Sequence, residues 1–317
     1  MGKKKSLAVL ASMSLTAVML LGCVNSSSEP VFQAETIQQG KWVDELSTDQ
    51  AAYEPGESVK LSLSLKEKVK EGKILVQYKH LAETVKEEEI NLKDEEISWS
   101  WKPEEDDFKG YMVEVYVKQG DEVIDHQNIG VDVSSDWAKF PRYGYLADFY
   151  DMEADLQEDV INQLNRFHIN GLQFYDWQYK HEKPLKMEDG KLASTWPDIA
   201  NREVSRDTIE RYISLAHEKN MKAMNYNLLF GSYEGAEDEG VKKEWGLFKD
   251  PDAEEQDHHP LPDNWASDIY LMDPSNKGWQ DFILNEEKQV FNHLDLTDGT
   301  SISLVTVAYF GMVTGRR

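Results

Sequence analysis

Cysteine and positive charge are the two features this sequence has least of. Cys23 is the single cysteine among 317 residues, which excludes an intrachain disulfide and any cysteine-based metal cluster. Lys and Arg number 34 against 59 Asp and Glu, giving a formal net charge of −25. Because phosphate recognition requires a basic surface, this balance argues against nucleic acid as a partner. It equally disfavours electrostatic docking on an anionic membrane surface.

A hydrophobic run long enough to cross a bilayer is also missing from the N-terminal region. The uncharged apolar run over residues 7–21 is short of the roughly 20 residues that a spanning helix needs. A basic stretch, Lys3 to Lys5, precedes it. This pattern is typical of a secretory signal peptide, which we place at residues 1–22.

The lone cysteine falls at the end of that run. Leu20-Leu21-Gly22-Cys23 resembles the lipobox of bacterial lipoproteins, in which the cysteine is lipidated and becomes the mature N-terminus. An ordinary signal peptide with an incidental cysteine is the alternative, but the position of Cys23 favours lipidation. Residues 23–41 then form a solvated tether. We expect an exported protein, anchored by lipid to the outer face of the bacterial cell membrane.

Residues 42–136 have the pattern of a β-domain. Residues 59–65 alternate strictly between apolar and polar side chains, which indicates a half-buried strand. Segments 74–78, 97–101 and 111–117 repeat the pattern, with glycine-containing turns between them. Several short strands separated by turns predict an immunoglobulin-like β-sandwich.

After Trp137, strands and helices alternate. The expected strands cover residues 142–149, 170–176, 221–229 and 269–273, and the expected helices cover 153–167, 205–220 and 277–294. Ser205 is the predicted N-cap of the middle helix. Repeated β-α units imply a parallel sheet, and a (β/α)₈ barrel is the first choice. The chain therefore predicts a multidomain β plus α/β protein, with the first part of the barrel over residues 137–294.

Aromatic and hydrogen-bonding residues gather where the expected barrel strands end. A barrel carries its chemistry at that edge, and aromatic rings flanked by carboxyl, amide and imidazole groups suit the C–H faces and hydroxyls of sugars. In the other interpretation, these rings close the barrel mouth and the aspartates cap helices. Three successive strands with the same pattern favour a carbohydrate cleft. The candidate residues are Tyr145, Asp148, Asp176, Trp177, His181, Asn225 and Asp273.

Specific segments resemble a known family. Tyr143 to Phe149 (YGYLADF), Phe174 to His181 (FYDWQYKH), Asn225 to Asn227 (NYN) and Leu271 to Pro274 (LMDP) are similar to the front of glycoside hydrolase family 66. That family contains endo-dextranases and cycloisomaltooligosaccharide glucanotransferases. The resemblance implies an immunoglobulin-like domain, a (β/α)₈ barrel and a C-terminal β-domain, with retaining action on α-1,6-linked glucan such as dextran.

The resemblance also implies roles for the candidate residues. Asp176, Trp177 and His181 are expected around the non-reducing-side glucosyl unit, with Tyr145, Asp148, Asn225 and Asp273 as further substrate contacts. No cofactor and no metal are expected. His258 and His259 are adjacent, so their side chains diverge, and no third ligand follows at useful spacing.

The two catalytic carboxylates of the family have no counterpart in this sequence. The family's nucleophilic aspartate lies in a motif resembling G-F-D-G-W-H-I-D, just after the helix that here ends near Leu294, and its acid/base glutamate lies later. Here residues 298–305 read DGTSISLV, and no acidic residue follows Thr300. Codons overlapping these residues are compatible with the family motif in a shifted frame. We hypothesise that residues 295–317 are out-of-frame translation.

This hypothesis predicts a barrel truncated before both carboxylates and therefore an inactive chain. Two alternatives stay open. One is a fragment of a cycloisomaltooligosaccharide glucanotransferase, because hydrolase and cyclising transferase cannot be separated from these residues. The other is a non-catalytic lipoprotein that binds carbohydrate.

Overall fold

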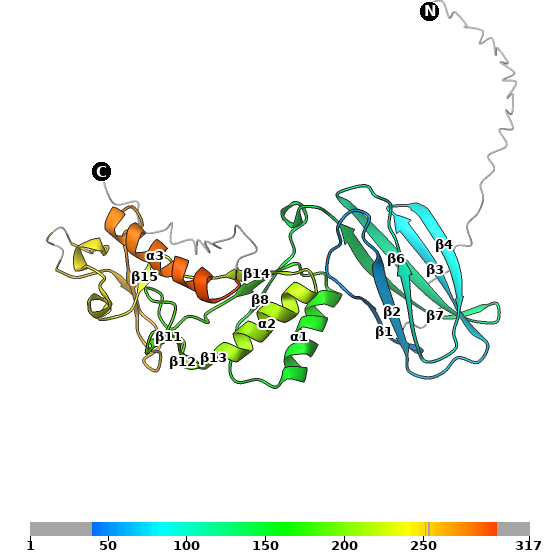
Figure 1. Ribbon diagram of the computed structural model, residues 1–317, viewed down its shortest axis with the longest axis horizontal. Helices are drawn as coiled ribbons and strands as arrows, with labels where there is room; N and C mark the ends of the chain where they lie inside the picture. Colours follow the sequence, from blue (N-terminus) through cyan, green and yellow to red (C-terminus); the bar gives the residue numbers. More distant parts are fainter. Residues whose placement is uncertain (1–39, 251, 253, 297–317) are drawn as a thin grey trace, which may run out of the picture. The chain divides into compact units, whose positions relative to one another are not determined.

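The computed structural model describes residues 40–250, 252 and 254–296 of the chain (Figure 1). The described part is mostly β-structure with three α-helices. No helix within it is both long and apolar enough to cross a membrane. The expected signal peptide (1–22), Cys23, nearly all of the tether (23–41) and the tail from residue 297 lie outside the described residues.

Two antiparallel sheets form the N-terminal part. Their strand orders are β1-β2-β5 and β4-β3-β6-β7. The expected alternation is confirmed in β2, where Val59, Leu61, Leu63 and Leu65 are buried and the residues between them are not. Both sheets contribute to one hydrophobic core. The strands are β1 (Val43–Thr48), β2 (Val59–Leu65), β3 (Gly72–His80), β4 (Glu83–Asn91), β5 (Glu96–Trp101), β6 (Lys109–Gln119) and β7 (Glu122–Val133).

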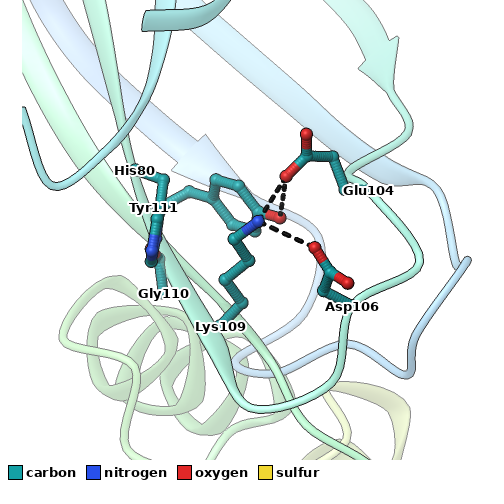
Figure 2. A network of polar contacts seen from close by, with 6 residues as sticks. All are labelled: His80, Glu104, Asp106, Lys109, Gly110 and Tyr111. Atoms are coloured by element: carbon teal, nitrogen blue, oxygen red, sulfur yellow. Dashed lines mark hydrogen bonds and ion pairs between the residues drawn. The ribbon is translucent and has the colours of Figure 1, made fainter. Parts of the chain in front are cut away.

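An acidic loop between β5 and β6 is tied to the sheet by a lysine. Figure 2 shows Lys109 between Glu104 and Asp106, with the Tyr111 ring beside it. The Lys109 Nζ lies 2.9 Å from Asp106 and also contacts Glu104. These two carboxylates raise the pKa of Lys109. Lys109 at the start of β6 therefore neutralises part of the negative charge of the loop, and the Glu104 and Asp106 side chains remain exposed to solvent.

A parallel sheet follows, with strand order β14-β9-β8. It comprises β8 (Tyr143–Leu146), β9 (Gly171–Phe174) and β14 (Lys222–Asn225). In register, Phe174 of β9 faces both Leu146 and Asn225, so all three strands end at the same edge. The described residues form no closed barrel.

Helices connect the parallel strands, as expected from the hydrophobic periodicity. α1 (Ala154–Arg166) joins β8 to β9, and α2 (Arg206–Glu218) precedes β14. Figure 1 shows α1 and α2 side by side. The predicted N-cap is confirmed, because the Ser205 side chain accepts a hydrogen bond from the Thr208 amide at the start of α2. Between β9 and α2 lie two small hairpins: β10 (Met187–Glu188) with β11 (Lys191–Leu192), and β12 (Thr195–Pro197) with β13 (Glu203–Ser205).

The segment after β14 differs from the prediction. Residues 269–273 were expected to give a fourth parallel strand, but β17 (Ile269–Leu271) pairs antiparallel with β15 (Gly231–Ser232) and β16 (His258–His259). A parallel partner needs a long crossover, usually a helix. The described residues between β14 and β17 contain no α-helix, and they form the short strands β15 and β16 and two 3₁₀ turns. The predicted final helix is confirmed as α3 (Lys277–His293), capped by the Asn276 side chain.

Candidate functional site

A cavity of about 260 Å³ opens beside the carboxyl ends of β9 and β14. Residues just after these two strands form one side of the cavity, and the segment that contains β16 and β17 forms the other. Of the residues predicted from the sequence, Asp176 and His181 line it. The complete lining is Tyr175, Asp176, His181, Ile199, Tyr226, Leu228, Phe230, His259, Leu261, Trp265, Ile269 and Leu271.

Aromatic rings form much of the cavity surface. Tyr175 and Tyr226 follow β9 and β14 directly, and their ring centroids lie 4.4 Å apart with an interplanar angle of 34°. Tyr145 extends the aromatic surface, with its ring centroid 6.0 Å from that of Tyr175. Tyr145 is 68% exposed and does not line the cavity itself. An apolar ring surface of this kind can stack on the C–H face of a sugar.

Asp176 supplies the carboxyl group of the cavity. Its φ of 52° lies in the left-handed region, which aspartate tolerates better than most residues and which turns the chain sharply after β9. Burial raises the pKa of Asp176 to about 6; Arg202 lowers it and Asp198 raises it. The structure gives its carboxyl oxygens no hydrogen-bond partner among the described residues, so Asp176 can bond to a ligand.

Arg202 connects the neighbouring carboxylates. Its Nε donates to the buried Asp198 at 2.7 Å, and its guanidinium lies 3.7 Å from the carboxylate of Asp148. The Asp148 side chain is 74% exposed and does not line the cavity. Asp148 is therefore connected to the neighbourhood of the cavity by its ion pair with Arg202, and its own side chain faces solvent.

His181 contributes an imidazole from behind the aromatic surface. It is only 3% exposed, and its Nδ1 lies 3.3 Å from Oδ1 of Asn227. The ring of Tyr233 meets it edge to face, with centroids 5.7 Å apart. Burial lowers the pKa of His181 to about 4, so the ring is neutral near neutral pH.

Trp177 and Asn225 lie behind the cavity and do not line it. Trp177 is fully buried, and its Nε1 donates to Oδ1 of Asn225 at 3.0 Å. The indole of Trp196 in turn donates to the backbone oxygen of Trp177 at 2.7 Å. In this structure both predicted residues therefore support the site from within the core, and neither presents a surface to a ligand in the cavity.

Asp273 lies apart from the other predicted residues. Its Oδ1 accepts hydrogen bonds from the Ser275 amide at 2.9 Å and from the Ser275 hydroxyl at 2.7 Å. This geometry closes the turn that leads into α3. Asp273 therefore stabilises the turn before α3, whereas the cap of that helix is Asn276.

The structure adds one group that sequence analysis missed. Glu287 on α3 is 1% exposed and accepts hydrogen bonds from the side-chain amides of Asn225 and Asn227. The helical spacing could have indicated its burial, because Glu287 falls four residues after Ile283 and three before Val290, on the buried face of α3. Burial raises its pKa to about 7, and the two asparagine hydrogen bonds lower it.

No metal centre is evident in the part of the chain that the structure describes. No group of three or more His, Cys, Asp or Glu side chains there could hold an ion. His259 lines the cavity, whereas Nε2 of its neighbour His258 lies 3.7 Å from the Asp268 carboxylate.

Known proteins resemble this chain over most of its length. A cycloisomaltooligosaccharide glucanotransferase from Niallia circulans is 32% identical over 89% of this chain and 29% of its own length. A dextranase from Streptococcus salivarius is 25% identical over 38% of this chain and 16% of its own length. The chain thus spans less than a third of the length of these curated relatives.

A solved structure shows the same relationship. The crystal structure of a Paenibacillus cycloisomaltooligosaccharide glucanotransferase, complexed with cycloisomaltoheptaose, matches with a TM-score of 0.73 and 30% identity. The match covers 79% of this chain and 36% of that one. The model of glycosyl hydrolase family 66 matches residues 48–306. The resemblance noticed in the sequence is confirmed, and the chain belongs to glycosyl hydrolase family 66.

Proposed function

We propose that this protein is a family 66 glycoside hydrolase of the dextranase type, a type that acts by a retaining mechanism, and that its cavity binds α-1,6-linked glucan such as dextran although the polypeptide as it stands is inactive. The observation that carries the proposal is the cavity, where the Tyr175 and Tyr226 rings stand beside the unpartnered carboxyl group of Asp176. A glucosyl unit offers C–H faces to rings and hydroxyls to polar groups. A dextranase and glucanotransferases among the relatives support a glucan of this kind.

The cavity supports a division of roles among the predicted residues. Asp176 and His181 bond to sugar hydroxyls, and Tyr145 extends the aromatic surface outward. Trp177 and Asn225 hold the strand ends in place. Asp148 acts through Arg202, and Asp273 shapes the turn before α3. We keep Asp176 as a hydrogen-bonding residue and not as the nucleophile.

A second candidate is a cycloisomaltooligosaccharide glucanotransferase. Two glucanotransferases from Niallia circulans match 89% and 80% of this chain, whereas the dextranase matches 38%. A third candidate, a non-catalytic carbohydrate-binding lipoprotein, is favoured by the same cavity if binding occurs without turnover. Turnover of dextran would separate the two enzymes, because a hydrolase gives linear oligosaccharides and a transferase cyclic ones. If the glucan is unchanged, retained dextran binding favours the binding protein and loss of binding favours an inactivated enzyme.

We assign residues 42–136 to an immunoglobulin-like domain and residues 137–294 to the first part of a (β/α)₈ barrel. Seven strands in two sheets around one core support the first assignment. Three parallel strands with α1 and α2 between them support the second. In this proposal the open edges of the parallel sheet correspond to positions of further barrel strands.

We also propose that this polypeptide does not hydrolyse dextran by itself. Retention of configuration requires two carboxyl groups about 5–5.5 Å apart. Residues 298–305 stand where the family has its nucleophile motif, and we infer that residues 295–317 are translated out of frame. Nucleotide sequencing from the Phe291 codon to a few hundred bases beyond the Arg317 codon tests this. The family motif in a shifted frame supports the idea, whereas an uninterrupted frame without that motif rejects it.

Lipid attachment at Cys23 is proposed from the sequence alone. It places the protein on the outer face of the bacterial cell membrane, where a soluble polysaccharide is accessible. Metabolic labelling with a fatty acid tests it in cells that express the full chain. Label in the wild type and none in Cys23→Ser is the expected result, and an unlabelled wild type contradicts the anchor.

Affinity electrophoresis in dextran-containing gels tests the binding function. We expect dextran to retard the chain and Asp176→Asn to reduce the retardation. Asp189→Asn is the matched control, because Asp189 also has a positive φ of 49° but lies in the exposed β10–β11 turn. Equal mobility with and without dextran would reject the proposal.

A further inference from the structure

A carboxyl group from α3 reaches the end of strand β14. Oε2 of Glu287 accepts from Nδ2 of Asn225 at 2.6 Å, and Oε1 accepts from Nδ2 of Asn227 at 2.5 Å. An ionised carboxyl group has acceptors and no donor. Both asparagines must therefore turn their NH₂ groups toward Glu287 and their oxygens away from it.

The oxygen of Asn225 faces a group that can only donate. Nε1 of Trp177 donates to this oxygen at 3.0 Å, and an indole nitrogen has no acceptor capacity. Asn225 is thus held between an acceptor and a donor. Its amide has one orientation that satisfies both neighbours.

Asn227 is held in the same way, with a consequence for His181. Its Nδ2 donates a second time, to the backbone oxygen of His181 at 2.9 Å. Two acceptors therefore fix its NH₂ end, and its Oδ1 faces Nδ1 of His181 at 3.3 Å. Because an amide oxygen can only accept, Nδ1 must carry the proton. In the neutral ring, Nε2 is then the unprotonated nitrogen.

We propose that Glu287 is a positioning residue that holds His181 in the Nδ1–H tautomer, so that Nε2 accepts a hydrogen bond from a saccharide hydroxyl. His181 lines the cavity, and the described residues provide no hydrogen-bond partner for Nε2. That a saccharide donates the hydrogen bond rests on the proposed function, whereas the tautomer of His181 does not. Burial lowers the pKa of His181, which keeps the ring neutral.

Replacing Glu287 by glutamine puts a donor where one of the two acceptors was. One of the asparagines then faces that donor and must turn over. A turned Asn225 would present NH₂ to Trp177, which cannot accept. A turned Asn227 would give up its bond to the backbone oxygen of His181 and present NH₂ to Nδ1 of that residue. Histidine can relieve the second conflict by moving its proton to Nε2. The tautomer of His181 is therefore the expected point of change.

Nitrogen NMR of the full chain with isotopically labelled histidine measures the tautomer directly. The chain has 8 histidines, and His181→Gln identifies the signal of interest. At about pH 8, where Glu287 is ionised, we expect His181 to be the Nδ1–H tautomer in the wild type and to shift toward Nε2–H in Glu287→Gln. Glu286→Gln is the matched control, because Glu286 is the preceding residue and bonds to neither asparagine.

The wild-type spectrum alone can overturn the proposal. A bare Nδ1 in the wild type contradicts the network, and it does so even if Glu287→Gln fails to fold. An unchanged tautomer in a folded Glu287→Gln variant contradicts the role of Glu287. A change of the His181 tautomer in Glu286→Gln as large as that in Glu287→Gln also contradicts the role of Glu287.

Saccharide binding provides the second measurement. Loss of one hydrogen-bond acceptor is expected to weaken isomaltooligosaccharide binding by about threefold to tenfold in Glu287→Gln. Unchanged affinity in that variant contradicts the proposed use of Nε2. If the wild type binds no saccharide, the proposed function fails, while the ligand-free spectra still decide whether Glu287 sets the tautomer.

Discussion

Tyr175 and Tyr226 occupy corresponding positions directly after the neighbouring parallel strands β9 and β14, and their ring centroids lie 4.4 Å apart. The residues before them, Phe174 and Asn225, are direct partners in the β9–β14 register. The pairing of these strands therefore brings the two rings together at the sheet edge. Tyr226 is 3% exposed and supports Tyr175, which is partly exposed to the cavity. The aromatic surface of the site depends on this register.

Removing the outer ring should weaken glucan binding. Tyr175→Leu keeps an apolar side chain but loses the flat surface, so we expect a dissociation constant for isomaltooligosaccharides about threefold to tenfold higher, measured by calorimetry. Tyr150→Leu is the control, because Tyr150 is 47% exposed and does not line the cavity. Equal losses in the two variants would contradict a stacking role.

Glu287 should make stability depend on pH. Burial raises its pKa from 4.5 to about 7, so the folded state binds the proton more tightly than the unfolded state. Its stabilising contribution is fully present below pH 4.5 and is lost as the pH rises through 7. Relative to Glu287→Gln, the wild-type free energy of unfolding should fall by about 3 kcal/mol between about pH 4.5 and pH 8.

Urea denaturation of both proteins across this pH range measures that difference. Titration of Asp176, which has no contact with Glu287 in the described residues, occurs in both proteins and cancels in the comparison. Parallel pH profiles for the wild type and Glu287→Gln would show that the carboxyl group does not titrate in this range.

The cap of α2 should contribute measurably to stability. Oγ of Ser205 accepts from the Thr208 amide, and Ser205→Ala leaves that amide without its side-chain partner. We expect a loss of about 1 kcal/mol in the free energy of unfolding. Ser214→Ala on the exposed side of α2 is the control and should change it far less. A similar effect in both variants would contradict the capping role.

Local pattern was sufficient to predict much of this fold. Alternation over residues 59–65 predicts β2 because one face of that strand is buried and the other is not. The apolar spacing over residues 153–167 predicts α1 for the equivalent reason at helical period. Asp176 and His181 were predicted to belong to one site because polar residues after parallel strands meet at one edge, and both line the cavity.

Contacts between distant segments could not be predicted in the same way. A short apolar run such as residues 269–271 does not specify the direction of pairing, and β17 pairs antiparallel with β15 and β16, which lie 37 or more and 10 or more positions earlier in the chain. The burial of Trp177 follows from Trp196 and Asn225, which lie elsewhere in the chain. Glu287 and Asn225 are separated by 62 residues in the sequence, so no local pattern predicts the hydrogen bond between them.

A crystal structure of the chain with a bound isomaltooligosaccharide tests the central claim most directly. The account predicts a glucosyl unit in the cavity, with its face against Tyr175 and its hydroxyls within hydrogen-bond distance of the Asp176 carboxyl group and Nε2 of His181. An ordered saccharide bound elsewhere, with the cavity empty, would contradict it.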